Sequence, residues 1–137
     1  MPSESDKKDL ELFLGHSNPQ VRQQALTILS GLTVDEANVS FFSDKMFQHM
    51  IRLLSFDGHT SVILGIFVNL SQYSSFQLNE SLLKKIIAVV MELLREISFI
   101  YVELAIMLLA NLSRDENAAN ILLQVNDPHL KGLYIQR

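Results

Sequence analysis

The chain has 137 residues, which is enough for one domain but not for a large enzyme with a separate cofactor domain. Its composition, 48% hydrophobic and 19% charged, is typical of a globular protein and not of a disordered one. Lys and Arg total 11 against 15 Asp and Glu, and a net charge of −4 does not favour a nucleic-acid partner.

The absence of cysteine excludes disulfides, thiolate metal sites and a cysteine nucleophile. The first residues, "MPSESDKKDLE", are polar and lack the apolar region of a signal peptide, so we expect a cytoplasmic protein. The longest stretch without charge, residues 58–79, contains many Ser, Asn and Gln residues. We therefore expect no membrane span.

Apolar residues recur at steps of three and four along the chain, which predicts an all-α protein. Asn18 before Pro19 and Ser43 before Asp44 are expected to cap helices. In chain order, the predicted helices are Asp9–Gly15, Pro19–Leu32, Asp44–Ser55, His59–Tyr73, Glu80–Ile97, Phe99–Ser113 and Glu116–Val125.

Three of these helices align without gaps. The segments are "ALTILSGLT" from Ala25, "ILGIFVNLS" from Ile63 and "AIMLLANLS" from Ala105, spaced by 38 and then 42 residues. A hydroxyl residue ends each segment, at Thr33, Ser71 and Ser113. The apolar positions that match, and that we expect in the core, are Ala25, Ile63 and Ala105; Ile28, Ile66 and Leu108; Leu29, Phe67 and Leu109; and Leu32, Leu70 and Leu112.

Periods near 40 residues with two or three helices each are typical of armadillo and HEAT repeats, so the sequence predicts an armadillo/HEAT-like α-solenoid. We expect a single domain over residues 1–137, with about three repeats near residues 9–33, 43–73 and 80–115 and the start of another at 116–137. Amphipathic helices rich in Leu, Ile and Ala also align by chance. The shared "NLS" ending of the second and third segments favours a true repeat.

A helical wheel of each repeat's last helix places the core positions on one side and a candidate partner groove on the other. Asn69 and Asn111 either bond the backbone of a partner or satisfy carbonyls at the ends of their own helices. Asp115 is expected to cap the next helix in a solvated turn with Arg114 and Glu116. The groove residues are Gln20, Gln23, Thr27, Ser30, Ser61, Gly65, Val68, Asn69, Gln72, Ile100, Glu103, Met107, Asn111 and Arg114.

Catalytic and metal-binding patterns are not apparent, so we expect no enzyme activity and no cofactor. The histidines, at positions 16, 49, 59 and 129, are scattered and lack the spacing of metal ligands. The carboxylate pairs Asp35–Glu36 and Asp115–Glu116 fall in predicted turns, where a raised pKa is not expected. Four N-x-[ST] patterns, at Asn38, Asn69, Asn79 and Asn111, are interpreted as coincidences of composition.

The segments "HSNPQVRQQALTILSGLT" and "VELAIMLLANLSRDENAANILL" resemble the amino-terminal region of the eukaryotic HGH-type armadillo family. The resemblance implies a cytosolic, ATP-independent adaptor that assists folding of translation elongation factor 2 and delivers it to the cytosolic chaperonin and heat-shock chaperones. It covers nearly the whole chain. Because members of that family are much longer, we expect this chain to be the N-terminal part of a longer protein.

A generic armadillo peptide- or protein-binding module, such as a transport or assembly scaffold, is the alternative. Nuclear import carriers in this class are characterised by a ladder of Trp-x-x-x-Asn patterns on the helices that line their groove. Here the positions four before Gly31, Asn69 and Asn111 hold Thr27, Gly65 and Met107, and the chain has no Trp. Binding of classical basic signals is therefore disfavoured.

Overall fold

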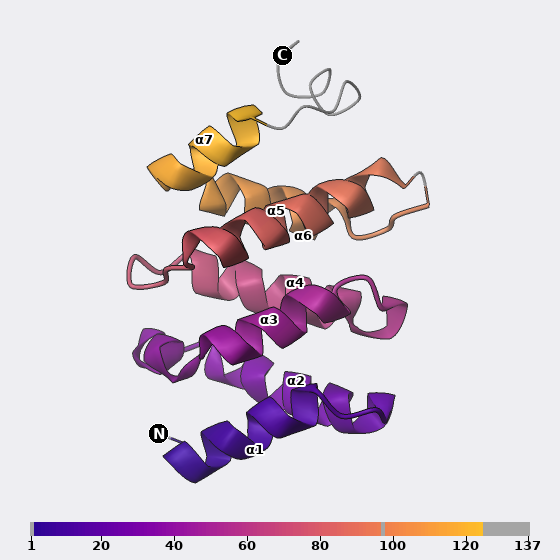
Figure 1. Ribbon diagram of the computed structural model, residues 1–137, viewed down its shortest axis with the longest axis vertical. Helices are drawn as coiled ribbons and strands as arrows, with labels where there is room; N and C mark the ends of the chain where they lie inside the picture. Colours follow the sequence, from indigo (N-terminus) through magenta and orange to yellow (C-terminus); the bar gives the residue numbers. More distant parts are fainter. Residues whose placement is uncertain (1, 97, 125–137) are drawn as a thin grey trace.

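The computed structural model describes residues 2–96 and 98–124, and the regular structure within them is helical (Figure 1). The prediction of an all-α protein is therefore confirmed for the described part of the chain. The helices are α1 (Glu4–Leu14), α2 (Pro19–Leu32), the 3₁₀ helix η1 (Glu36–Phe41), α3 (Asp44–Leu53), α4 (Asp57–Ser71), α5 (Glu80–Arg95), α6 (Val102–Leu112) and α7 (Glu116–Gln124).

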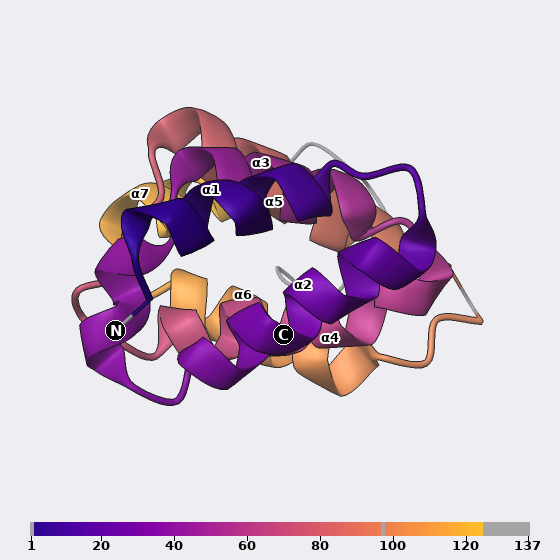
Figure 2. The ribbon, with the colours of Figure 1, turned by 90° about the horizontal axis from the view of Figure 1, so that it is seen from below.

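The helices lie in two rows. One row contains α1, α3, α5 and α7, and the other contains α2, α4 and α6, as the end-on view shows (Figure 2). Each helix packs on the next one in its own row, so α4 lies between α2 and α6. Across the rows, α1 packs on α2, α3 on α4 and α5 on α6. The chain thus advances along the stack by alternating between its two rows (Figure 1).

The hydrophobic core lies between the rows and between neighbours within each row. Phe67 of α4 is fully buried, and its ring lies 5.8 Å from that of Phe47 in α3. Phe47 also stacks on Phe42 at 6.1 Å and meets the ring of Phe76 edge-on at 5.7 Å. These aromatic contacts join the two rows at the middle of the stack.

Side-chain caps determine where several helices begin. The prediction for α2 is confirmed at both ends, with Asn18 accepting a 2.9 Å hydrogen bond from the backbone of Gln20. Ser43 caps α3 as expected. The prediction for α1 was wrong by five residues, because a capping box of Ser3 and Asp6 starts this helix at Glu4.

Other helix ends differ from the predictions by up to three residues, and η1 was not predicted. Asp35, expected in a solvated turn, caps η1 by accepting a hydrogen bond from the backbone of Ala37. Helix α4 begins two residues earlier than predicted, and α6 begins three residues later because Tyr101 has a non-helical backbone. The predicted last residues of two helices, Ile97 and Val125, lie outside the described residues.

Ile28 was wrongly predicted as a core residue. Its side chain is 54% exposed, whereas the aligned Ile66 and Leu108 are fully buried. Helices α4 and α6 each pack on the preceding helix of the same row. Helix α2 is the first of its row within the described residues, so the same position has no neighbour to cover it.

No helix of the described part of the chain combines the length and the apolar character needed to cross a lipid bilayer.

Candidate interaction surface

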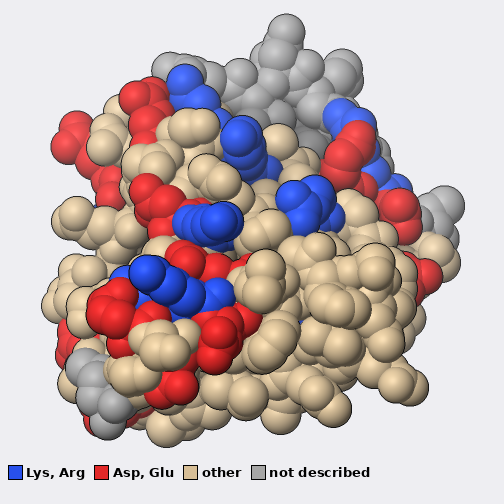
Figure 3. Space-filling view, turned by 60° about the horizontal axis from the view of Figure 1, so that its bottom comes forward, with Lys and Arg blue, Asp and Glu red and all other residues tan. Residues whose placement is uncertain are grey.

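The two rows differ in charge. Helices α2, α4 and α6 contain one Lys, Arg, Asp or Glu each, namely Arg22, Asp57 and Glu103. Helix α1 alone contains six such residues, Glu4, Asp6, Lys7, Lys8, Asp9 and Glu11. Figure 3 shows charged side chains gathered over one side of the molecule beside a broad area that has none. We call the row of α2, α4 and α6 the uncharged row, and the other row the charged row.

The exposed and half-buried residues of the uncharged row, together with Ile100 before α6 and Gln72 and Arg114 after α4 and α6, form what we call the outer surface. It contains the predicted groove residues other than Val68. Gln23, Ser30, Gly65, Asn69 and Asn111 are half-buried. The predicted residues that are exposed are Gln20, Thr27, Ser61, Gln72, Ile100, Glu103, Met107 and Arg114.

Val68 was wrongly assigned to the groove. It is buried at 9% exposure, and its carbonyl oxygen accepts a hydrogen bond of 3.3 Å from the amide of Asn111. Its place on α4 therefore faces α6 and not solvent.

The side-chain amides of Asn69 and Asn111 do not satisfy carbonyls at the ends of their own helices, as one interpretation of the sequence expected, but bond the preceding helix of the row. The amide of Asn69 donates to Thr33 Oγ1 at 2.9 Å, and that of Asn111 donates to Ser71 Oγ at 3.1 Å. Each hydroxyl in turn donates to the carbonyl three residues before it, Thr33 to Ser30 and Ser71 to Val68. The same hydroxyl–amide hydrogen bond therefore joins α2 to α4 and α4 to α6.

The four N-x-[ST] asparagines all have structural hydrogen bonds. Besides Asn69 and Asn111, Asn38 donates to the carbonyl of Leu32 at the end of α2. Asn79 caps α5 by accepting a hydrogen bond from the backbone of Leu82. These roles account for the asparagines without any modification.

His59 has a structural role that the sequence did not reveal. It is buried at the start of α4, accepts a 3.2 Å hydrogen bond from Arg22 Nε, and has Nδ1 3.0 Å from the Gln23 side-chain oxygen. The ring of Phe56 stacks on it at 4.8 Å. Burial, followed by the positive charge of Arg22, lowers the pKa of His59 below 6.5. A neutral ring can accept from Arg22 through Nε2 while donating to Gln23 through Nδ1.

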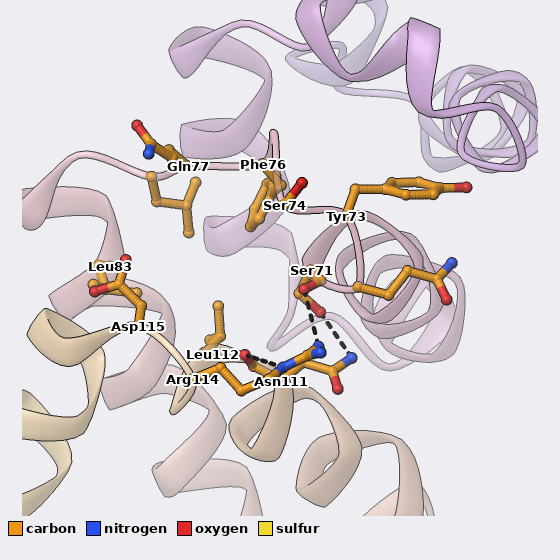
Figure 4. Close-up of a pocket in the computed structure, with 12 residues that line it drawn as sticks. Ser71, Tyr73, Ser74, Phe76, Gln77, Leu83, Asn111, Leu112, Arg114 and Asp115 are labelled. Carbon is orange, nitrogen blue, oxygen red and sulfur yellow. Dashed lines mark hydrogen bonds between the residues drawn. The ribbon is translucent and has the colours of Figure 1, made fainter.

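A cavity of about 310 Å³ opens where α4 and α6 end (Figure 4). It is lined mainly by the connection from α4 to α5 and by the last residues of α6. Arg114 at its wall donates through Nε to the Asn111 carbonyl at 3.3 Å and through Nη2 to the Ser71 carbonyl at 3.4 Å. Its guanidinium therefore satisfies carbonyls at the ends of both helices, which is a structural use of a residue predicted for the groove.

The outer surface offers hydrogen bonds and apolar contacts. Within residues 2–96 and 98–124, no three His, Asp or Glu residues lie together in a group that could hold a metal ion.

Asp115, beside the cavity, caps α7 as expected by accepting a 2.7 Å hydrogen bond from the backbone of Asn117. His129, the last of the four histidines, lies outside the described residues.

Comparison of the chain with protein-family models, curated proteins and solved structures gives no match. The function of the outer surface is therefore inferred from its own residues.

Proposed function

We propose that the chain is a non-enzymatic protein-binding scaffold that uses its outer surface to hold a partner protein. The observation that supports this most is the scarcity of charge on the uncharged row, whose outer surface also exposes Ile100 and Met107. Isolated exposed apolar residues are common, but an uncharged area that includes large apolar side chains is typical of interaction sites.

The architecture we propose is the armadillo/HEAT-like α-solenoid of about three repeats. The pairs α1–α2, α3–α4 and α5–α6 would be the repeats, and α7 would begin another. The alternation between rows and the hydroxyl–amide bond that recurs from α2 to α6 support this interpretation.

Small residues on the outer surface would let a partner come close to the helices. A Cβ atom added at Gly31 or Gly65 would meet no atom within 4 Å, so the space in front of both is open. Exposed amides and hydroxyls nearby, such as those of Gln20, Thr27 and Ser61, can donate to and accept from a partner backbone. The combination suits an extended segment or an incompletely folded protein.

The partner we propose is translation elongation factor 2 in the cytoplasm, with the cytosolic chaperonin and heat-shock chaperones as later recipients. This identity depends on the resemblance of the two sequence segments to the HGH-type armadillo family and on no contact in the structure. The scaffold role and the partner's identity are therefore tested separately.

The test compares two substitutions at one position, Gly65→Arg and Gly65→Ala, in capture experiments from a eukaryotic lysate. Both remove the helix-propensity cost of a helix-interior glycine, up to about 1 kcal/mol, and circular dichroism of each variant shows whether it is folded. Arginine adds bulk and charge to the outer surface, whereas alanine adds one methyl group to open space. We expect newly made elongation factor 2 to be captured by the wild type and by Gly65→Ala, and to be lost with Gly65→Arg.

Capture of a different protein that is also lost with Gly65→Arg would retain the scaffold role and exclude the proposed partner. Equal capture by all three proteins would show that the outer surface is not the binding site.

A further inference from the structure

A groove of about 490 Å³ runs between α3 and α5, which lie next to each other in the charged row, on the near side of the stack in Figure 1. One side of each helix forms its walls, and we call it the α3–α5 groove. The residues along its middle are Ile51 and Arg52 of α3 and Lys85, Ala88 and Val89 of α5.

The groove lies within the length of the stack and not at either end of it. In the charged row, α3 packs on α1 and α5, and α5 packs on α3 and α7. Across the rows, α3 packs on α4 and α5 packs on α6. The two helices that form the groove therefore have a described neighbour on each side in the stack, and a further repeat at either end would leave the groove open.

The bottom of the groove is apolar and its rim is basic. Ile51 is 4% exposed and Val89 is half-buried, so aliphatic side chains form the floor. Arg52 on one helix and Lys85 on the other are exposed at the rim. The described residues that line the groove include no Asp or Glu, so its charge is positive although the net charge of the chain is −4.

The charge of Lys85 is not neutralised by a carboxylate of the described chain. Its neighbour Lys84 forms an ion pair with Glu80 at 3.3 Å, whereas Lys85 forms none within residues 2–96 and 98–124. The two lysines are adjacent in the sequence, but only Lys85 lines the groove. Its ammonium group is therefore available to an anionic occupant.

Arg52 is positioned by a neutral partner. Its Nη2 atom lies 2.7 Å from Nδ1 of His49, and because a guanidinium can only donate, the imidazole accepts this hydrogen bond. Burial, followed by the charges of Arg52 and Lys45, lowers the pKa of His49 below 6.5 and keeps the ring neutral at pH 7. The contact with His49 therefore holds the guanidinium in place and leaves its positive charge uncompensated.

The length of the groove limits its occupant. Gln48 and Ser55 mark the two ends of its α3 side, roughly 10 Å apart at a rise of about 1.5 Å per residue. An extended chain of about three residues spans this distance. The exposed amide of Gln48 and hydroxyl of Ser55 can both donate to and accept from the backbone of such a chain.

We propose that the α3–α5 groove binds a short, extended, acidic segment of a partner protein, in which carboxylates flank an apolar side chain. The carboxylates would pair with Arg52 and Lys85, and the apolar side chain would cover Ile51 and Val89. Residues 125–137 of this chain do not match that description, because they contain two basic residues and one acidic residue. The groove shares no residue with the outer surface, so the proposal goes beyond the proposed function and does not depend on it.

The probe is a fluorescently labelled peptide, Asp-Glu-Leu-Glu-Asp, and its uncharged control is Asn-Gln-Leu-Gln-Asn. The full chain is titrated into each peptide at an ionic strength of about 20 mM, and fluorescence anisotropy follows binding. Binding of the acidic peptide should saturate below about 1 mM, and the control should not saturate. Serine in place of the central leucine should weaken binding at least about threefold, because the apolar contact is lost.

Two neighbouring lysines of α5 provide a matched pair of variants. Lys85→Gln should weaken binding of the acidic peptide about fivefold, the effect of one exposed ion pair at the upper end of its range. Lys84→Gln removes the same charge outside the groove and should change binding by less than about twofold. Arg52→Gln should weaken binding as much as Lys85→Gln does. Circular dichroism of each variant shows whether it is folded.

Four results would overturn the proposal. They are the absence of saturable binding to the folded wild type, equal binding of the acidic and uncharged peptides, and equal weakening by Lys84→Gln and Lys85→Gln, which would indicate long-range attraction alone. The fourth is a wild-type dimer, seen by light scattering, that becomes a monomer with Lys85→Gln, because the occupant would then be a second copy of the chain.

Failure of this groove and failure of the outer surface are distinguishable. The Gly65→Arg variant should bind the acidic peptide as the wild type does, because Gly65 lies on the uncharged row. The Lys85→Gln variant should capture the elongation factor as the wild type does.

Discussion

The charged row and the uncharged row have the same secondary structure and nearly the same spacing, yet they differ in what they present to solvent. Helices α1, α3 and α5 alternate buried apolar residues with Lys, Arg, Asp and Glu, as helices with one solvated side do. Helices α2, α4 and α6 present hydroxyls, amides, glycines and a few apolar side chains instead.

Together with the proposed function, the difference leads us to propose that solubility and recognition of the elongation factor are divided between the rows. Charges on the outside of the charged row keep the protein in water, and they contribute little to its stability because exposed ion pairs are weak. Both rows contribute buried residues to the core, and the uncharged row adds the hydroxyl–amide bonds and a surface with few charges, which we propose binds a partner. Substitutions of exposed charges should therefore have smaller effects than substitutions in the core.

The largest contrast is expected between Phe67→Ala and Lys84→Ala. Phe67 is fully buried in α4, and its truncation should lower the free energy of unfolding by about 3–5 kcal/mol. Lys84 of α5 is exposed and forms an i,i+4 ion pair with Glu80 at 3.3 Å, so its loss should cost less than about 0.5 kcal/mol. Urea denaturation followed by circular dichroism measures both. Similar losses for the two variants would contradict the weak contribution of exposed ion pairs to stability.

A smaller effect is expected at the hydroxyl–amide bond between α2 and α4. Asn69→Ala should destabilise the protein by about 1 kcal/mol, and a double-mutant cycle with Thr33→Val should show that most of this loss comes from their pairing. Asn120→Ala, at an exposed position of α7, is the control and should have little effect. Additive losses from Asn69→Ala and Thr33→Val would show that the bond does not couple the two helices.

The next prediction concerns how the free energy of unfolding changes as the pH falls. The pKa of His59 is lowered in the folded protein, first by burial and then by Arg22, so the unfolded chain binds a proton more readily. The stability that neutral His59 provides is complete above its unfolded pKa of 6.5 and is lost as the pH falls below 6.5 toward the folded pKa. The free energy of unfolding should therefore decrease between about pH 7.5 and about pH 5.5.

His59→Gln should make that decrease shallower without removing it. His49 of α3, in the charged row, also has a lowered pKa because of burial and the charges of Arg52 and Lys45, which outweigh the opposing charge of Glu11. Its titration should remain in the variant. Urea titrations at several pH values measure the slope, and an identical slope in wild type and His59→Gln would show that the Arg22–His59 contact is not sensitive to protonation.

The helical class and most helix positions could be predicted from the sequence because apolar periodicity and caps such as Asn18 and Ser43 are local signals. The early start of α1 was also encoded locally, by Ser3 and Asp6, but that polar segment lacks the apolar stripe used to find helices. The exposure of Ile28 could not be predicted from the periodicity of α2, because it depends on which other helices pack beside α2.

The candidate surface was predicted in outline but not in detail. A helical wheel identifies the outward side of each helix, and Thr27, Ser61 and Met107 are exposed as expected. It does not show which neighbour covers the margins of that side. Val68 and Asn111 lie at such margins, and their burial or bonding follows from how α4 and α6 pack together.

The most direct test of the proposed division between rows is a comparison of dissociation constants for purified, denatured and freshly diluted elongation factor 2. The Gly65→Arg chain has a new charge on the uncharged row, and the Lys85→Glu chain has a reversed charge at an exposed position of α5. We predict that Gly65→Arg weakens binding by at least about tenfold, equivalent to about 1.4 kcal/mol, and that Lys85→Glu changes it by less than about twofold. Weaker binding by Lys85→Glu with unchanged binding by Gly65→Arg would contradict the account and assign recognition to the charged row.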